Sequence, residues 1–237
     1  MGEGLNNEKD LMPYISSCSI ACGGHAGNTQ SMAQVALLAK EHQVKVGAHP
    51  SYPDKDNFGR VSMDIVPELL IDSIKNQIED FVTILKAEKI EMHHIKPHGA
   101  LYNDIATNTV LARTFLKAID RYRNTAYLYV PHTSVISREA EGQGFKVKHE
   151  AFGDRNYNRD LSLVSRSLSQ AVIHSPEKAL AHIVTMLKEG QVRTLDGDII
   201  KIIADTFCIH GDTPSALQIL MYLSKELPNH NIHIERA

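Results

Sequence analysis

The stretch IKPHGALY, residues 95–102, joins the end of an apolar run to a segment of helical character. Lys96, Pro97, His98 and Gly99 stand at the junction. A helix through Pro97 is untenable, because proline lacks the backbone N–H and clashes with the preceding turn. The polar residues therefore lie in a loop that leaves a strand, which is the repeating unit of a parallel α/β sheet.

Three other apolar runs end in the same way, with a histidine at or just after the last apolar residue. They read IACGGHAG, VKVGAHP and FCIHGD, and they supply His25, His49 and His210. Ligands of parallel α/β folds bind at the carboxyl ends of the strands. We therefore expect these three histidines and His98 to face one pocket.

Short apolar runs alternate with longer segments of helical period along the chain, in about seven βα units. The expected strands are residues 16–22, 44–49, 91–96, 126–130, 145–152 and a strand within 199–210, and the expected helices include about 30–42, 64–88 and 175–190 and one that opens at Thr213. The helix at 175–190 has clear end signals. Ser175 is expected to cap it, Pro176 to be its first residue and Gly190 to end it. A barrel is favoured, but an open doubly wound sheet has the same alternation.

The composition is that of a globular protein. The chain has 237 residues, of which 43% are hydrophobic and 22% charged, and we expect residues 1–237 to form one domain. The net charge of -3 does not favour nucleic acid or an anionic membrane as a partner. Cys18, Cys22 and Cys208 lack the spacing of a zinc ribbon and are expected to be reduced thiols of a cytoplasmic protein.

Lys96 is the most unusual polar residue, because a lysine in an apolar strand exit must reach water or meet a negative partner. Further candidates lie in or near other strand ends, namely His132, Glu150, Asp205 and Asp212. Tyr102 is a candidate polar residue at the rim of the pocket. His93 and His94 are adjacent in a strand and should point to opposite faces. His230 and His233 are expected to be solvated in the tail.

The irregular segment 153–171 is a candidate lid or binding loop. Its Arg155 and Arg166 could hold a carboxylate or phosphate, or could be surface arginines. Asp54 could be a carboxylate partner or a turn residue. The motifs of P-loop nucleotidases, Rossmann dehydrogenases, serine hydrolases and zincins are absent from the sequence.

Six motifs, in order, make the chain similar to the LamB/YcsF family. They are IACGGHAGN, VGAHPSYPD followed by FGR, KPHGALYN, EAFGDRNY, LVSR and ADTFCIHGD. The resemblance implies a distorted, TIM-like β/α barrel similar to the glycoside hydrolase and deacetylase barrels. Family members begin with a strand that ends in Asn-Cys-Asp-x-Gly-Glu, whereas this chain reads Met1-Gly2-Glu3. We therefore expect the first strand, and the acidic residue that it brings to the site, to be missing here.

The resemblance also implies an activity. This family is associated with the A subunit of ATP-hydrolysing 5-oxoprolinase, which acts with subunits B and C to open the lactam of 5-oxo-L-proline to L-glutamate. ATP, with Mg²⁺, would be required, and no metal is expected on the chain itself. A metal-dependent hydrolase similar to deacetylases or glycosidases, and a non-catalytic scaffolding subunit, are alternatives. The sequence leaves open whether the chain forms a homo-oligomer.

The expected roles follow from lactam chemistry. Lys96 and His98 would stabilise a phosphorylated lactam oxygen, and His49, or His210 with Asp212, would transfer protons. The expected substrate-binding residues are His25, Asp54, Tyr102, Glu150, Arg155 and Arg166.

Overall fold

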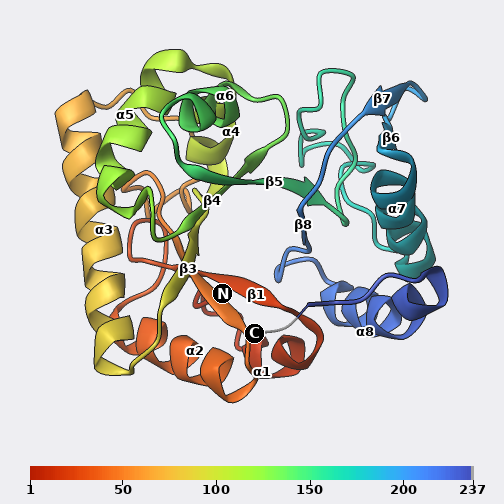
Figure 1. Ribbon diagram of the computed structural model, residues 1–237, viewed down its shortest axis with the longest axis horizontal. Coiled ribbons are helices and arrows are strands. Elements are labelled where there is room, and N and C mark those ends of the chain that lie inside the picture. The colour runs from red at the N-terminus through yellow and green to blue at the C-terminus, as the bar shows by residue number, and fades with distance from the viewer. Residues whose placement is uncertain (236–237) are drawn as a thin grey trace.

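The computed structural model describes residues 1–235 and is built around one curled parallel sheet (Figure 1). Its six strands are β1 (Ser17–Ala21), β2 (Lys45–His49), β3 (Met92–Ile95), β4 (Tyr127–Pro131), β5 (Lys146–Phe152) and β8 (Thr206–Cys208), in that order across the sheet. The strand order follows the chain without reversal, whereas a doubly wound sheet changes direction at a switch point. The prediction of a distorted β/α barrel is confirmed.

The helices lie around the outside of this sheet (Figure 1). They are α1 (Glu8–Leu11), α2 (Thr29–Glu41), α3 (Pro67–Ala87), α4 (Gly99–Thr107), α5 (Thr109–Ile119), α6 (Val135–Gly142), α7 (Pro176–Glu189) and α8 (Ala216–Glu226), with short 3-10 turns at Met12–Tyr14, Asp120–Tyr122 and Leu227–His230. Helix α7 has the predicted ends, since Ser175 caps it, Pro176 is its first residue and Gly190 follows it in the left-handed conformation. None of the helices in residues 1–235 combines the length and apolarity needed to cross a membrane.

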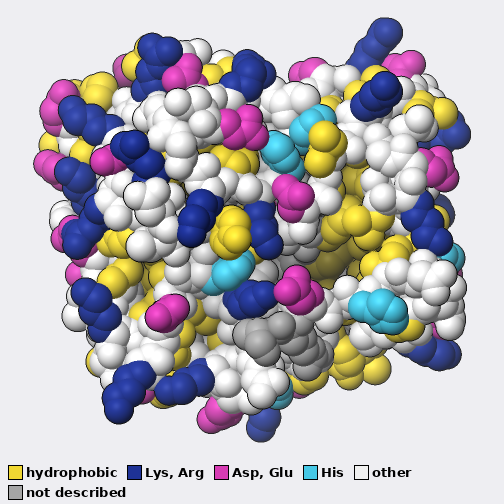
Figure 2. All heavy atoms as spheres, in the orientation of Figure 1, with side chains coloured by type: hydrophobic (Ala, Val, Ile, Leu, Met, Phe, Trp, Pro, Cys, Tyr) yellow, Lys and Arg dark blue, Asp and Glu magenta, His cyan; other side chains and the backbone are white. Residues whose placement is uncertain are grey.

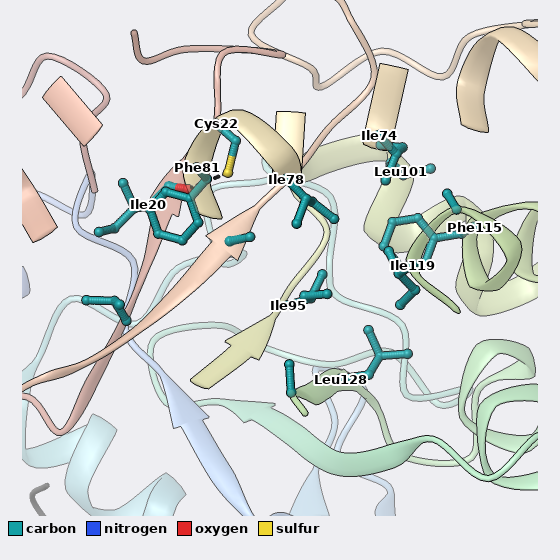
Figure 3. Close-up of a cluster of buried hydrophobic side chains, with 14 of the residues drawn as sticks. Ile20, Cys22, Ile74, Ile78, Phe81, Ile95, Leu101, Phe115, Ile119 and Leu128 are labelled. Atoms are coloured by element: carbon teal, nitrogen blue, oxygen red, sulfur yellow. Dashed lines mark hydrogen bonds between the residues drawn. The ribbon is translucent and has the colours of Figure 1, made fainter. Parts of the chain in front are cut away.

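The main core lies between the outer face of β1–β4 and the surrounding helices (Figure 3). Strand residues such as Ile20, Ile95 and Leu128 meet helix residues such as Phe81 and Phe115, all of them nearly inaccessible to solvent. Side chains alternate between the two faces of a strand. The neighbours of these apolar residues in the strands therefore point inward, into the lumen of the barrel.

The second half of the barrel is built from smaller pieces. Residues 199–210 were expected to contain one strand, but they contain two in different sheets. The strand β7 (Ile199–Lys201) pairs antiparallel with β6 (Gln191–Arg193), and β8 joins the main sheet beside β5. The missed hairpin turns through a backbone hydrogen bond from Thr194 to Asp198, and its three-residue strands are too short to show a period.

The prediction for His93 and His94 is wrong, because both line the lumen. The register between β2 and β3 shifts, with Val46 opposite Met92 but Gly47 opposite His94, so His93 is an extra, bulged residue. The Nδ1 atoms of the two histidines are 3.2 Å apart. Gly47 makes room for this arrangement, because a Cβ there would lie 2.3 Å from the His94 ring.

The first residues of the chain lie beside β1. The Met1 nitrogen donates to the Ser19 carbonyl, and the Ala21 N–H donates to the Met1 carbonyl, each at 3.0 Å. This position carries Glu3 to the carboxyl end of the sheet, where its carboxylate contacts His25. Glu3, which lies in the retained Met1-Gly2-Glu3 segment, therefore supplies a carboxylate to the site, and the absence of the acidic residue of the first strand stays a prediction.

Candidate active site

A cavity of about 1160 Å³ occupies the lumen, and residues at the carboxyl ends of the strands, such as His49, Lys96 and Cys208, are among those that line it. Figure 2 shows the hollow between β5 and α8, with hydrophobic side chains inside it. Polar side chains of the strands line the cavity, together with residues 161–167 of the long loop and residues 232–235 of the tail, including His233. The predicted loop therefore forms part of the cavity wall.

On one side of the cavity lies the histidine wall, defined as Glu3, His49 and His98, which line the cavity, together with the buried His25 behind them. The Nε2 atom of His25 lies 3.1 Å from Glu3 Oε1, and Nε2 of His49 lies 3.0 Å from His98 Nδ1. The rings of His25 and His98 stack with their centroids 3.6 Å apart. Three of the four predicted histidines therefore come together.

Backbone carbonyls fix the orientation of two of these rings. His49 Nδ1 lies 2.6 Å from the Lys96 carbonyl, and His98 Nε2 lies 3.0 Å from the Phe58 carbonyl. Burial lowers the pKa of His49 well below its usual value, and neighbouring His98 and His25 lower it further. Burial, followed by the effect of His25, lowers the pKa of His98 to about 3. Both rings are neutral at physiological pH.

Glu3 behaves in the opposite way. Burial alone would raise the pKa of its carboxyl group, but the hydrogen bond with His25 and the nearby positive groups lower the pKa to about 2. Glu3 is therefore a carboxylate over the whole physiological range, and it faces the two neutral rings of His49 and His98.

Gly99 explains how the loop after β3 comes so close to the loop after β2. Its φ is +56°, and a Cβ on this residue would lie 2.4 Å from the Gly59 carbonyl oxygen. That same carbonyl accepts a hydrogen bond from the Ala100 N–H. A side chain at position 99 would push the loops apart and displace His98 from the histidine wall.

On the other side of the cavity lies the acid-paired wall, defined as Lys96, Glu150 and His210, which line the cavity, together with the buried Asp154 behind His210. Lys96 Nζ lies 2.8 Å from Glu150 Oε1 and donates to Cys208 Sγ at 3.2 Å. Only 8% of Lys96 is exposed, so it meets a negative partner and does not reach into water. Burial disfavours its charged form, but Cys208 and the Glu150 carboxylate outweigh burial and raise its pKa.

Two buried polar atoms beside this ion pair have no close hydrogen-bond partner within residues 1–235. They are the second carboxylate oxygen of Glu150 and the hydroxyl of Tyr102, and these two residues lie near enough to interact with each other. Both residues line the cavity. An unpaired buried polar group costs free energy, so these atoms are suited to bind polar groups of a ligand.

His210 pairs with Asp154 and not with Asp212, which was its expected partner. Its Nδ1 lies 3.0 Å from Asp154 Oδ1, and Asp154 Oδ2 also accepts from the His210 N–H and the Thr213 hydroxyl. Burial alone would raise the pKa of Asp154, but His210 and these hydrogen bonds lower it to about 2. This buried carboxylate fixes the His210 ring and leaves Nε2 available to the cavity.

Asp212 lies on the cavity rim between two arginines. Arg60 donates to its Oδ2 at 2.6 Å, and both terminal nitrogens of Arg166 lie 3.5 Å from its carboxylate. Arg60 belongs to the FGR motif but was not among the predicted site residues. Two guanidinium groups on one carboxylate leave one positive charge in excess at the rim.

Two predicted substrate-binding residues have local structural contacts. Arg155 is buried and donates to the backbone carbonyls of Val164 and Ala171, which holds the long loop together. Asp54 accepts hydrogen bonds from Asn57 in a turn, as its alternative interpretation proposed. Asp54 does not appear among the described residues that line the cavity.

His132 and Asp205 form a separate group near the cavity edge. The His132 ring meets His149 edge to face, and Asp205 accepts from the His149 N–H at 2.8 Å. Both line the cavity but belong to neither wall. Cys22, buried beneath the histidine wall, donates to the Ile20 carbonyl, and burial raises the pKa of its thiol to about 12. A nucleophilic role for Cys22 is not supported by these contacts.

The resemblance implies Mg²⁺ together with ATP, so the cavity would need ligands that suit this ion. Within residues 1–235, the potential metal ligands that lie close together are Glu3, His49 and His98. Magnesium prefers oxygen ligands, whereas this group offers two imidazole nitrogens and one carboxylate. This group does not fit Mg²⁺, and we assign no Mg²⁺ contact to the chain.

Fold and cavity together define a distorted β/α barrel whose polar residues meet at the carboxyl ends of the strands. The LamB/YcsF family model matches residues 1–237, and the chain belongs to this family. It is 40% identical over 230 residues to the A subunit of 5-oxoprolinase from Pyrococcus abyssi, covering 97% of this chain and 90% of that protein.

Two further relatives agree. The A subunit of 5-oxoprolinase from Shouchella clausii is 39% identical over 231 residues, covering 98% of this chain and 91% of that protein. The crystal structure of a lactam utilization protein from Thermus thermophilus matches with a TM-score of 0.92 and 34% identity, covering 100% of this chain and 97% of that one.

Proposed function

We propose that this chain is the A subunit of an ATP-dependent 5-oxoprolinase and that its cavity opens the lactam ring of 5-oxo-L-proline to give L-glutamate. The observation that carries the proposal is that two different walls meet in one cavity. One holds the paired rings of His49 and His98, and the other holds Lys96 and His210 against carboxylates. The similarity to proteins named as the A subunit of 5-oxoprolinase supports the choice of substrate.

The substrate sets three requirements. Its five-membered lactam is an unreactive amide, so its oxygen needs stabilisation as negative charge develops. Its ring nitrogen needs a proton when the C–N bond breaks. Its carboxylate needs a positively charged anchor. We propose that ATP activates the lactam oxygen by phosphorylation and that two partner subunits, B and C, take part in this step.

The anchor is the pair Arg60 and Arg166. Both contact Asp212 at the rim, and together they carry one positive charge more than that carboxylate neutralises. A substrate carboxylate can take one of the guanidinium groups in a bidentate contact. This assignment replaces the buried Arg155, whose donors hold the loop backbone.

Proton transfer belongs to His210. Asp154 accepts from Nδ1, so Nε2 carries the lone pair and acts as a general base toward an attacking water. The protonated ring then gives its proton to the leaving ring nitrogen, which leaves a glutamyl phosphate, and a second water releases the phosphate to give L-glutamate. The Asp154 carboxylate stabilises the positive ring between these two steps.

Lys96 supplies the fixed positive charge. It is buried and held by Glu150, so little reorganisation is needed when negative charge develops on the lactam oxygen or its phosphorylated form. The neighbouring Tyr102 hydroxyl, which lies beside the Glu150 carboxylate, donates to the same oxygen in this proposal. The cavity therefore has a group for each of the three requirements.

The test is ATP-dependent release of glutamate from 5-oxo-L-proline by the purified chain together with purified subunits B and C. We expect turnover with the wild-type chain and loss of turnover with Lys96→Ala. Lys117→Ala, on the solvent side of α5, is the matched control and should retain turnover.

Three results would reject parts of the proposal. Unchanged ATP-coupled turnover with Lys96→Ala would reject the catalytic role of this lysine. Unchanged turnover with every variant of the two walls would favour a scaffolding role. Hydrolysis that needs no ATP but stops on chelation would favour a metal-dependent hydrolase.

A further inference from the structure

The hydrogen bonds of His49 and His98 leave two lone pairs facing each other. His49 uses its Nδ1 proton to donate to the Lys96 carbonyl, and His98 uses its Nε2 proton to donate to the Phe58 carbonyl. A neutral imidazole has one N–H, so His49 Nε2 and His98 Nδ1 are both acceptors. These two atoms are 3.0 Å apart, and neither ring has a proton left for the other.

The two facing nitrogens are held in this orientation. The Lys96 and Phe58 carbonyls fix the other side of each ring, and the ring of His25 stacks on that of His98. A metal ion bound by both nitrogens would satisfy the two facing lone pairs.

Glu3 adds the third ligand atom. Its Oε1 lies 4.0 Å from His98 Nδ1, and the three ligand atoms of Glu3, His49 and His98 all lie within 4.8 Å of one another. Two ligand atoms bound to a metal at about 2.1 Å and at a right angle are about 3.0 Å apart. The separation of the two nitrogens has this value, and Glu3 needs a small shift to complete the group.

Each of the three residues is also held by a second partner. The Lys96 carbonyl orients His49, the Phe58 carbonyl orients His98, and His25 Nε2 contacts the Glu3 carboxylate. Supporting hydrogen bonds of this kind fix the tautomer and direction of metal ligands. All three proposed ligands line the cavity, so a bound ion would have coordination positions open to it.

We propose that Glu3, His49 and His98 form a binding site for one divalent transition-metal ion. Two imidazoles and one carboxylate suit Zn²⁺, Mn²⁺, Fe²⁺ or Co²⁺ better than Mg²⁺ or Ca²⁺. The expectation that the chain holds no metal is replaced by this site. The inference does not depend on the lactam activity, because it rests on the geometry of the histidine wall alone.

The experiment uses the chain without an affinity tag, stripped of metal by chelation, and without ATP, substrate or partner subunits. Co²⁺ is titrated in and followed by its visible absorption, and Zn²⁺ binding is measured by calorimetry. We expect one equivalent of metal per chain and a higher midpoint of thermal unfolding on binding. Failure of the lactam assay would not affect this result.

Three variants locate the site. Glu3→Gln and His98→Asn should each weaken binding by about 100-fold or more, since they remove a ligand, and His25→Gln should weaken it by about 10- to 100-fold, since it removes a supporting contact. His132→Asn, a cavity histidine outside both walls, should bind as the wild type does. Circular dichroism of the metal-free proteins shows whether each variant folds.

The proposal is overturned if the folded wild-type chain binds no stoichiometric Co²⁺ or Zn²⁺. It is also overturned if His25→Gln and Glu3→Gln bind as tightly as His132→Asn. A third contrary result is a nitrogen NMR spectrum of the metal-free chain that shows a proton shared between His49 and His98 at pH 7.

Discussion

The two walls of the cavity use the same residue type in opposite ways. In the histidine wall, backbone carbonyls orient neutral rings, and burial opposes their protonation. In the acid-paired wall, Glu150 holds the ammonium group of Lys96, and Asp154 fixes the Nδ1–H tautomer of His210. The histidine wall therefore offers lone pairs, whereas the acid-paired wall holds a fixed positive charge and a histidine whose protonated form a carboxylate can stabilise during proton transfer.

The largest expected effect comes from removing the charge beside His210. Asp154→Asn should lower kcat by about 10³- to 10⁴-fold, because the amide no longer fixes the Nδ1–H tautomer or stabilises the protonated ring. The measurement is steady-state glutamate release with the partner subunits. Asp212→Asn is the matched control and should change kcat less than tenfold, because Asp212 contacts the rim arginines. Equal losses in the two variants would contradict the pairing.

Breaking the other buried pair should reduce stability as well as activity. Lys96→Met leaves the Glu150 carboxylate buried without its partner, so the free energy of unfolding should fall by about 3–5 kcal/mol. Adding Glu150→Gln should recover most of this loss, whereas turnover should stay absent. Urea unfolding followed by circular dichroism measures the first effect. No recovery in the double variant would show that the loss does not come from an uncompensated charge.

His94, which lies in the lumen below the histidine wall, should make the stability of the protein depend on pH. His94 is buried on Tyr129, and burial, followed by His93, lowers its pKa well below 6.5. The His94 ring takes up a proton near pH 6.5 in the unfolded chain but stays neutral in the folded chain. The free energy of unfolding is therefore highest above pH 6.5 and falls as the pH is lowered below that value. For this one proton, the slope is about 1.4 kcal/mol per pH unit.

The variant His94→Phe keeps an aromatic ring against Tyr129 but cannot titrate. The free energy of unfolding between pH 6 and pH 5 should therefore fall less steeply in this variant, by about 1.4 kcal/mol per pH unit, than in the wild type. Parallel slopes in urea unfolding would contradict a neutral, buried His94.

The smallest expected effect lies at the rim. Arg166→Lys keeps the charge but removes the planar pair of donors, so the KM for 5-oxo-L-proline should rise about tenfold with little change in kcat. Substrate saturation curves with the partner subunits measure this. A fall in kcat at constant KM would place Arg166 with the reacting atoms and not with the substrate carboxylate.

Sequence reasoning succeeded where the signal is local. The cap, first residue and stop of α7 are side-chain and backbone preferences that need no tertiary contact, and α3 repeats apolar residues along one stripe. The β6–β7 hairpin was missed because three-residue strands show no period. The bulge at His93 was missed because it depends on the register with β2.

In the site, too, features set by local sequence were predicted, and features set by tertiary contacts were not. Strand ends predicted that His25, His49 and His98 would meet, because parallel strands deliver their carboxyl ends to one edge of the sheet. The partner of His210 could not be found this way, because Asp154 is 56 residues distant and Asp212 is nearer in the chain. Asp154 nevertheless lies two residues after the end of β5 in the EAFGDRNY motif, and this position was a usable signal.

The two walls lie on one cavity, and a double-mutant cycle shows whether both act on the same substrate. ATP-coupled glutamate release is measured for His98→Asn, Asp154→Asn and the double variant, each with subunits B and C. We predict that each single variant loses at least about 100-fold in kcat and that the double variant loses far less than the product of the two losses, because residues that act as a unit are not additive. Wild-type turnover in either single variant would contradict the claim.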